Sequence, residues 1–229
     1  TQGQPFSVKT TPAEELSVTT GHIDLAAALS NSDDGSHYTD GLYLPDRPVV
    51  LNTDHLTYKK LTFNNIDSRF TFKKGHIYIR LKNTDLCQIA TQGYLNLKQE
   101  LMFANFPFAS RENEDVQQLL NCLLGEPDLM DGTCTVKGNL TANGPQDSFT
   151  KRVEGDLVFD ARDGRIYKLT LLSRILSVLN VSQILKGKVP NIMQEGFEYK
   201  NITITADIRN SRIHLKKAVI DGADMTLIF

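Results

Sequence analysis

The side chains of this sequence best suited to acid–base chemistry or metal binding near neutral pH are its five histidines. They are His22, His37, His55, His76 and His214. No two of them stand at the helical spacing that holds a zinc ion, and none belongs to a recognisable catalytic triad motif. Most of them fall on the polar side of a predicted strand or in a loop. We therefore interpret them as surface histidines and expect no metal site.

The chain also lacks the common motifs of phosphate binding and nucleophilic catalysis, namely a P-loop, a GxSxG sequence and a dinucleotide fingerprint. Two Asp-Gly segments, at 33–35 and 160–164, resemble pieces of a calcium loop but lack its alternating oxygen ligands and distal Glu. An enzyme with scattered carboxylates is one alternative, although no carboxylate pair points to it and Trp is absent. We expect a protein that is not an enzyme and has no cofactor.

The composition and charge of the chain indicate which kinds of molecule it is expected to bind. The 229 residues carry a net charge of −2, so no basic surplus favours nucleic acid. No apolar run approaches the ~18 residues of a membrane span. The sequence has no initiator Met and no signal peptide, and its last residues, 225–229, resemble the middle of a strand. We therefore interpret the chain as a fragment of a larger protein, whose anchor would lie outside it.

Apolar residues recur at every second position from Val49 onward, which is typical of strands with one apolar face. Short turns between the runs predict antiparallel neighbours. We expect a mainly β fold with helical insertions (α+β), in which a curved antiparallel meandering sheet forms an apolar groove or half-barrel. The residues expected on the apolar face of that groove are Leu56, Tyr58, Phe70, Phe72, Ile77, Ile79, Leu81, Leu95, Leu97, Leu140, Leu157, Phe159, Ile202, Ile204, Ile213 and Leu215.

Turn residues separate the alternating runs. A Gly-containing turn at 73–75 predicts a hairpin, and Asn143-Gly144-Pro145 and Asn210-Ser211 predict two further turns. The Asp163-Gly164 pair is expected to end a strand. Residues 1–46 carry only scattered polar and turn signals, and we assign no element to them.

Two segments have helical rather than strand periodicity. Residues 112–124 predict a helix that Gly125 ends, with acidic residues in its first turn. Residues 169–180 divide into an apolar and a polar half on a helical wheel. The helix either packs its apolar half on the sheet or lies across a lipid-bearing groove or membrane surface. Its main apolar residues are Leu169, Leu172, Ile175, Leu176 and Leu179.

Several of these segments resemble landmarks of one family. The segment Leu86-Cys87 to Gly93 resembles the "LCGI-x-x-x-G" motif of AsmA-like C-terminal regions, with Gln88 in place of the usual Gly. Residues 119–123 resemble its "LL-x-CL" helix, 135–144 its following strand, and 155–180 its "dGrI … ls-x-iLs-x-LN" core. Residues 196–199 and 221–225 resemble its last two landmarks. The resemblance covers about 50–229, and residues 1–48 carry no landmark of the family.

The resemblance implies a function. AsmA-like proteins are bacterial envelope proteins anchored in the inner membrane, and they resemble bridge-like lipid transporters that span the periplasm. The chain would then be a single β-groove fragment, 1–229, that carries phospholipids toward the outer membrane and supports its integrity. Its partners would be phospholipid acyl chains, the rest of its own chain and possible envelope proteins, with no nucleic acid. The alternative is a structural or assembly factor for envelope proteins without lipid conduction.

The resemblance also bears on the three cysteines, whose spacing alone leaves open free thiols or a bond. Cys87 and Cys122 stand at the two cysteine landmarks of the family, and the periplasm is oxidising. We therefore predict a Cys87–Cys122 disulfide, with Cys134 free. A Cys122–Cys134 bond and three reduced thiols are the alternatives.

Overall fold

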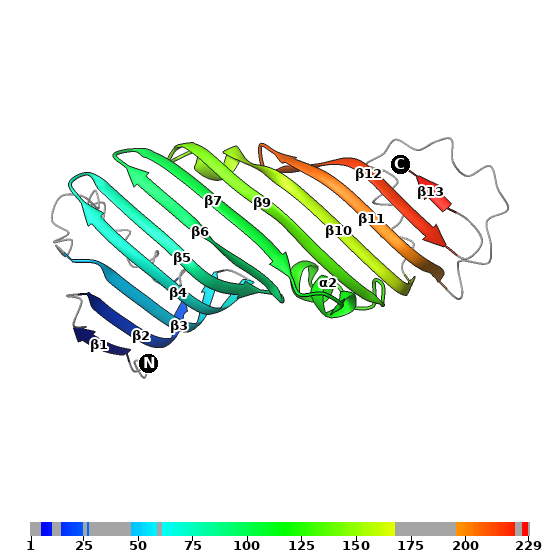
Figure 1. The fold of residues 1–229 in the computed structure, drawn as a ribbon, viewed down its shortest axis with the longest axis horizontal. Helices are drawn as coiled ribbons and strands as arrows, with labels where there is room; N and C mark the ends of the chain where they lie inside the picture. The colour runs from blue at the N-terminus through cyan, green and yellow to red at the C-terminus, as the bar shows by residue number, and fades with distance from the viewer. Residues whose placement is uncertain are drawn as a thin grey trace. The chain divides into compact units, whose positions relative to one another are not determined.

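A computed structural model describes residues 6–10, 15–24, 27, 47–58, 61–167, 196–222 and 226–228 (Figure 1). About three quarters of them lie in β-strands, so the mainly β expectation is confirmed. The strands before the helix are β1 (Phe6–Thr10), β2 (Leu16–Asp24), β3 (Val49–Tyr58), β4 (Leu61–Lys73), β5 (His76–Leu86), β6 (Ile89–Lys98), β7 (Leu101–Ser110) and β8 (Glu114–Asp115). After helix α2 (Val116–Leu124) come β9 (Thr133–Pro145), a 3-10 turn (Phe149–Arg152), β10 (Val153–Ile166), β11 (Phe197–Arg209), β12 (Arg212–Gly222) and β13 (Thr226–Ile228).

Hydrogen bonding joins these strands in the order β1-β2-β3-β4-β5-β6-β7-β9-β10-β11-β12-β13, and β8 pairs with β9 beside this path. The chain divides into two compact units. The first unit consists of Thr1–Phe108 and Asn139–Val153, and the second of Ala109–Gly138 and Glu154–Phe229.

In the first unit, tight turns join the strands from β4 to β7. The predicted hairpin is confirmed, because β4 and β5 pair in antiparallel fashion around Gly75, whose φ is 71°. Cys87 and Gln88, with φ of 54° and 68°, turn the chain from β5 into β6. Two consecutive residues with positive φ match the twist of the flanking strands in a two-residue hairpin. This geometry explains why neighbouring strands are antiparallel here.

The first two strands were missed by the sequence analysis. β1 and β2 pair in antiparallel fashion, whereas β2 and β3 are parallel. The expectation that neighbours are antiparallel is therefore wrong for this pair. It rested on short turns, and residues 25–48 separate these two strands in the sequence. The run Leu16-Ser17-Val18 does alternate, but it is followed by polar residues and Gly21, which gave no clear strand signal.

In the second unit, β10, β11 and β12 form an antiparallel layer, and Asn210 and Ser211 turn the chain as predicted. The prediction that Asp163-Gly164 ends a strand is wrong, because β10 continues to Ile166. Asp163 takes a left-handed φ of 51° inside the strand. It interrupts the alternation without ending the hydrogen-bonded pairing. Similarly, β9 runs through the Asn-Gly-Pro sequence to Pro145 before the chain turns.

Helix α2 confirms the helix predicted at 112–124, with a later start. Asp115 is its N-cap, and a side-chain oxygen of Asp115 accepts a hydrogen bond from Gln118 N at 3.0 Å. The acidic residues expected in its first turn instead precede it, because Glu114 and Asp115 pair with β9 as β8. Gly125 caps the other end with φ of 69°. Val116 and Leu119 are fully buried.

The buried apolar residues of the second unit come from α2, the segment that follows it and β9 to β12. They are Val116, Leu119, Leu129, Met130, Cys134, Val136, Ala161, Ile166, Phe197, Tyr199, Ile202, Ala206, Ala218 and Ile220. The amphipathic helix predicted at 169–180 lies outside the described residues. Within the described part of the chain, no helix has the length and apolar character needed to cross a membrane.

Candidate functional site

The registers of the first unit align apolar side chains in rows across β2 to β6. Residues opposite each other on paired strands share one face of the sheet. One row consists of Leu16, Val49, Phe70, Ile79 and Leu95. Its neighbours are the row of Phe72, Ile77 and Leu97 and the row of Val18, Leu51, Ser68, Leu81 and Gly93. Seven of the predicted groove residues therefore share one face.

Three other predicted residues of this unit are not placed in these rows. Leu56 lies opposite Phe63, and Tyr58 lies opposite Leu61. Asn65, with φ of 54°, interrupts the alternation of β4 between these pairs and the rows above. Leu140 lies on β9 and is half-buried.

All ten predicted residues of the first unit are half-buried. Among the described residues of this unit, only four apolar side chains are fully buried, namely Ile66, Cys87, Ala104 and Ala142. Apart from Ala27 and the 3-10 turn at Phe149–Arg152, the described part of the unit consists of strands and the turns between them (Figure 1). Its large apolar side chains are therefore sheltered mainly by their neighbours in the sheet.

The second unit also gathers its predicted residues on one face. The rows there are Leu157, Ala206 and Leu215; Phe159, Ile204 and Ala218; Ala161, Ile202 and Ile220; and Gly155, Ile208 and Ile213. Burial changes along this face, because Ile202 is 4% exposed and Ile213 is 64% exposed. The face is thus covered toward one end of the strands and open toward the other.

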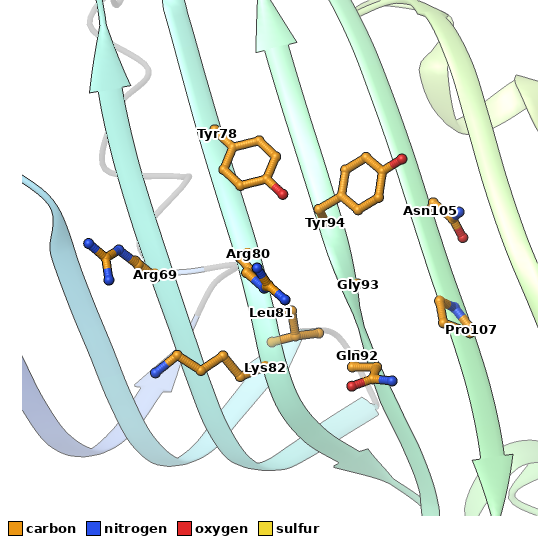
Figure 2. A pocket seen from close by; sticks show the side chains of 10 residues that line it. All are labelled: Arg69, Tyr78, Arg80, Leu81, Lys82, Gln92, Gly93, Tyr94, Asn105 and Pro107. Carbon is orange, nitrogen blue, oxygen red and sulfur yellow. The ribbon is translucent and has the colours of Figure 1, made fainter.

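The opposite face of the first unit carries a hollow of about 830 Å³ (Figure 2). Its main polar and aromatic lining residues are Arg69, Tyr78, Arg80, Lys82, Tyr94 and Asn105. Arg69, Arg80 and Tyr94 are cross-strand partners, one position away from the apolar row of Phe70, Ile79 and Leu95. Since successive side chains of a strand point to opposite faces, this hollow lies on the other side of the sheet.

The hollow is electropositive. Arg69 and Arg80 lie directly opposite each other on β4 and β5. Arg69 forms an ion pair with Glu15 at 2.5 Å, and Lys82 forms one with Asp67 at 3.2 Å. Arg80 has no ion pair with any residue in the described part of the chain. Like charges opposite each other destabilise a sheet.

The aromatic rings of Tyr78, Tyr94 and Phe103 lie beside these cations and are called the aromatic ledge below. The rings of Tyr78 and Tyr94 stack with centroids 6.0 Å apart, and Phe103 lies 5.8 Å from Tyr94. Tyr78 and Phe103 are each 38% exposed. Figure 2 shows the two tyrosine rings side by side next to Arg80.

Close strand packing shapes the bottom of the hollow. Gly93 has φ of 150°, and a Cβ there would lie only 2.1 Å from the main-chain oxygen of Asn105. The side-chain oxygen Oδ1 of Asn105 is buried and has no hydrogen-bond partner among the described residues. A buried acceptor without a donor is unfavourable, so a ligand that supplies a donor would satisfy it.

This hollow was not predicted from the sequence. Its signal was the polar half of the alternation, since Tyr78, Arg80 and Lys82 occupy the positions between Ile77, Ile79 and Leu81. The cross-strand partner Arg69 depends on the register of β4 against β5, which alternation alone does not specify.

Two of the four described histidines, His22 and His55, have ordinary polar partners. The ring nitrogen Nε2 of His22 lies 3.0 Å from Thr57 Oγ1, and Nδ1 of His55 lies 2.9 Å from Asn64 Oδ1. In the described part of the chain, no group of three or more His, Cys, Asp or Glu residues could hold a metal ion. His37 lies outside the described residues.

The cysteine prediction is confirmed. Cys87 and Cys122 form a disulfide, and Cys134 is free and buried. Burial, and to a smaller extent the charges of Glu114 and Asp115, raise the pKa of the Cys134 thiol to about 11. This thiol is therefore protonated, and poorly nucleophilic, at neutral pH.

Comparison with known proteins gave no match to a family model, to a curated protein or to a solved structure.

Proposed function

We propose that this chain belongs to a periplasmic, AsmA-like envelope protein and binds phospholipid acyl chains along the apolar face of its sheet. The observation that carries the proposal is the set of apolar rows across β2 to β6, centred on Phe70, Ile79 and Leu95. These residues are half-buried rather than sealed into a core. A contiguous apolar surface of this kind is typical of an interaction site.

Acyl chains suit these rows for two physical reasons. They need no hydrogen bonds, and each CH₂ group removed from water contributes about 0.8 kcal/mol. Strands are spaced about 4.8 Å apart, so a row across five strands extends for roughly 19 Å. The rows repeat with similar apolar residues, which allows a chain to shift from one row to the next without a large change in free energy.

Two further features support the cellular setting. The Cys87–Cys122 disulfide fits an oxidising compartment such as the periplasm. The resemblance to AsmA-like regions implies a protein that moves phospholipids toward the outer membrane. Within this proposal, the predicted helix at 169–180 would cover the apolar face or lie across it.

The test is lipid retention by the whole chain. Protein purified from the periplasm is extracted, and its phospholipids are quantified by mass spectrometry for wild type, Phe70→Gln and Ile79→Gln. Thr71→Gln is the matched control, because Thr71 neighbours Phe70 in β4 but faces the other way. Circular dichroism checks that each variant is folded.

We expect wild type and Thr71→Gln to retain phospholipid and the two row variants to lose most of it. Wild-type protein without bound phospholipid would contradict lipid carriage and favour the structural or assembly role. Equal retention by all folded variants would show that the rows are not the binding surface.

A further inference from the structure

We propose that the hollow lined by Arg69, Arg80 and Lys82 binds the phosphoryl group of a phosphate ester with a hydroxylated carbon skeleton. Its cations and tyrosines lie on the face opposite the apolar rows, whereas Leu81 and Gly93, which belong to one of those rows, also line it.

The positive charges that line the hollow favour binding of an anion. Arg69 and Arg80 are cross-strand partners, an arrangement that repels unless an anion lies between or beside them. Glu15 and Asp67 pair with Arg69 and Lys82, so Arg80 is the cation that lacks a carboxylate among the described residues. A guanidinium binds two phosphate oxygens with parallel hydrogen bonds, which gives both strength and orientation.

Lys82 can contribute a second contact. Its ion pair with Asp67 is at 3.2 Å, and the two side chains are 48% and 39% exposed. Exposed pairs of this kind contribute little to stability. Breaking the Lys82–Asp67 pair therefore costs little free energy, so the ammonium group can turn toward a phosphate in the hollow.

The aromatic ledge and Asn105 define the rest of the ligand. The exposed side of the Tyr78 and Tyr94 pair offers a flat surface to a carbon skeleton, and their phenols offer hydrogen bonds. Oδ1 of Asn105 has no partner among the described residues, so a ligand with a donor such as a hydroxyl group would satisfy it. The volume of about 830 Å³ lies in the usual range for small-molecule sites. A sugar phosphate or a phosphoglycerol headgroup fits all three features.

The site is tested by isothermal titration calorimetry with the whole chain. The soluble probes are glucose 6-phosphate, glycerol 3-phosphate, inorganic phosphate and unphosphorylated glucose. A second arm measures co-sedimentation with vesicles of phosphatidylglycerol in phosphatidylcholine. Arg80→Gln removes the central cation, and Lys98→Gln is the matched control. Lys98 is an exposed cation on β6 outside the hollow, and its replacement changes the net charge equally.

We expect the phosphate esters to bind and glucose to bind far more weakly. Arg80→Gln should weaken phosphate-ester binding about tenfold or more, since it removes a charge-assisted pair of hydrogen bonds. Lys98→Gln should bind like wild type. Tyr94→Leu should weaken glucose 6-phosphate more than inorganic phosphate, because only the sugar uses the ledge. Melting curves confirm that the variants are folded.

Arg80-dependent binding of the soluble esters supports the site and identifies a free phosphate ester as its ligand. Arg80-dependent binding of vesicles alone also supports it and identifies a lipid headgroup as the source. The proposal is overturned if neither arm binds, if glucose binds as well as its phosphate, or if Lys98→Gln weakens binding as much as Arg80→Gln.

Discussion

The phenol of Tyr199 donates a hydrogen bond to the main-chain oxygen of Asp131 across 2.5 Å. It ties the segment after α2 to strand β11. Tyr199 is 1% exposed, and burial, followed by the nearby charge of Asp131, raises the pKa of this phenol well above its ordinary value. The phenol thus stays protonated as a donor, and the stability linked to it is lost only as the pH rises through that raised pKa.

Replacing this phenol tests its contribution. Tyr199→Phe should lower the free energy of unfolding by about 1–3 kcal/mol, because the main-chain oxygen of Asp131 loses the donor that the buried Tyr199 supplies. Tyr167→Phe is the matched control, since its phenol bonds to the Asp131 carboxylate at 2.5 Å but its side chain is 47% exposed. Urea unfolding measures both. A larger loss in Tyr167→Phe would mean that the carboxylate, not the carbonyl, is the important acceptor.

Gly164 is expected to tolerate no side chain. A Cβ there would lie 2.1 Å from the oxygen of Asp131 and 2.6 Å from the phenol of Tyr199. Gly164→Ala should therefore destabilise the chain by about 2 kcal/mol or more, through displaced main chain and the lost hydrogen bond. Gly75→Ala meets no atom within 4 Å and should cost only the strain of its left-handed φ, about 1 kcal/mol. Thermal unfolding compares the two variants.

Removing the cap of α2 should have a moderate effect. Asp115→Ala should reduce stability by about 1 kcal/mol, because Gln118 N loses the carboxylate that caps it at 3.0 Å. Asp115→Asn retains a capping oxygen and should be close to wild type. Chemical denaturation followed by circular dichroism checks both, and equal losses would mean that the charge rather than the cap is important.

The three thiols should differ in chemistry. Non-reducing peptide mapping should yield a crosslinked Cys87–Cys122 peptide, and Cys134 should resist alkylation in the folded protein at pH 8, since its pKa is about 11. Because this pKa is raised, the associated stability is present below the unfolded value and declines as the pH rises toward 11. Reducing the disulfide should cost roughly 3–4 kcal/mol for a loop of about 35 residues. Three alkylatable thiols after denaturation of periplasmic protein would contradict the pairing.

The amphipathic segment at 169–180 remains a prediction. Leu172→Asp or Ile175→Asp should destabilise the fold or abolish lipid retention, because both residues lie near the middle of the apolar arc. Ser173→Asp and Ser177→Asp should be far milder. Melting temperature and bound phospholipid are measured for all four, and equal effects on both faces would refute the wheel assignment.

Local signals predicted much of this fold. The alternation around Phe70 and Ile79 predicted both strands and the turn between them, because the side-chain period of a strand is two and a tight turn fixes the register. The helix at 116–124 followed from its apolar spacing and from Gly125. Both kinds of signal lie within a few residues of the element that they specify.

Other features depend on contacts that a local pattern does not contain. The parallel pairing of Leu16 with Val49 joins segments that no short turn connects. Asp163 continues a strand in a left-handed conformation because its neighbours Arg162 and Gly164 both stay paired with β11. Arg69 and Arg80 become opposite each other only through the β4–β5 register. The candidate phosphate site could therefore not be assembled from the sequence alone.

The order of strands in the first unit also has a consequence for synthesis. From β3 to β7, each strand is hydrogen-bonded to the strand that precedes or follows it in the chain. During translation each new strand finds its partner already made, so loop-closure entropy is small and each exposed edge is covered soon after it appears. β2 is the exception, because its pairing with β3 must wait for residues 25–48 to be made.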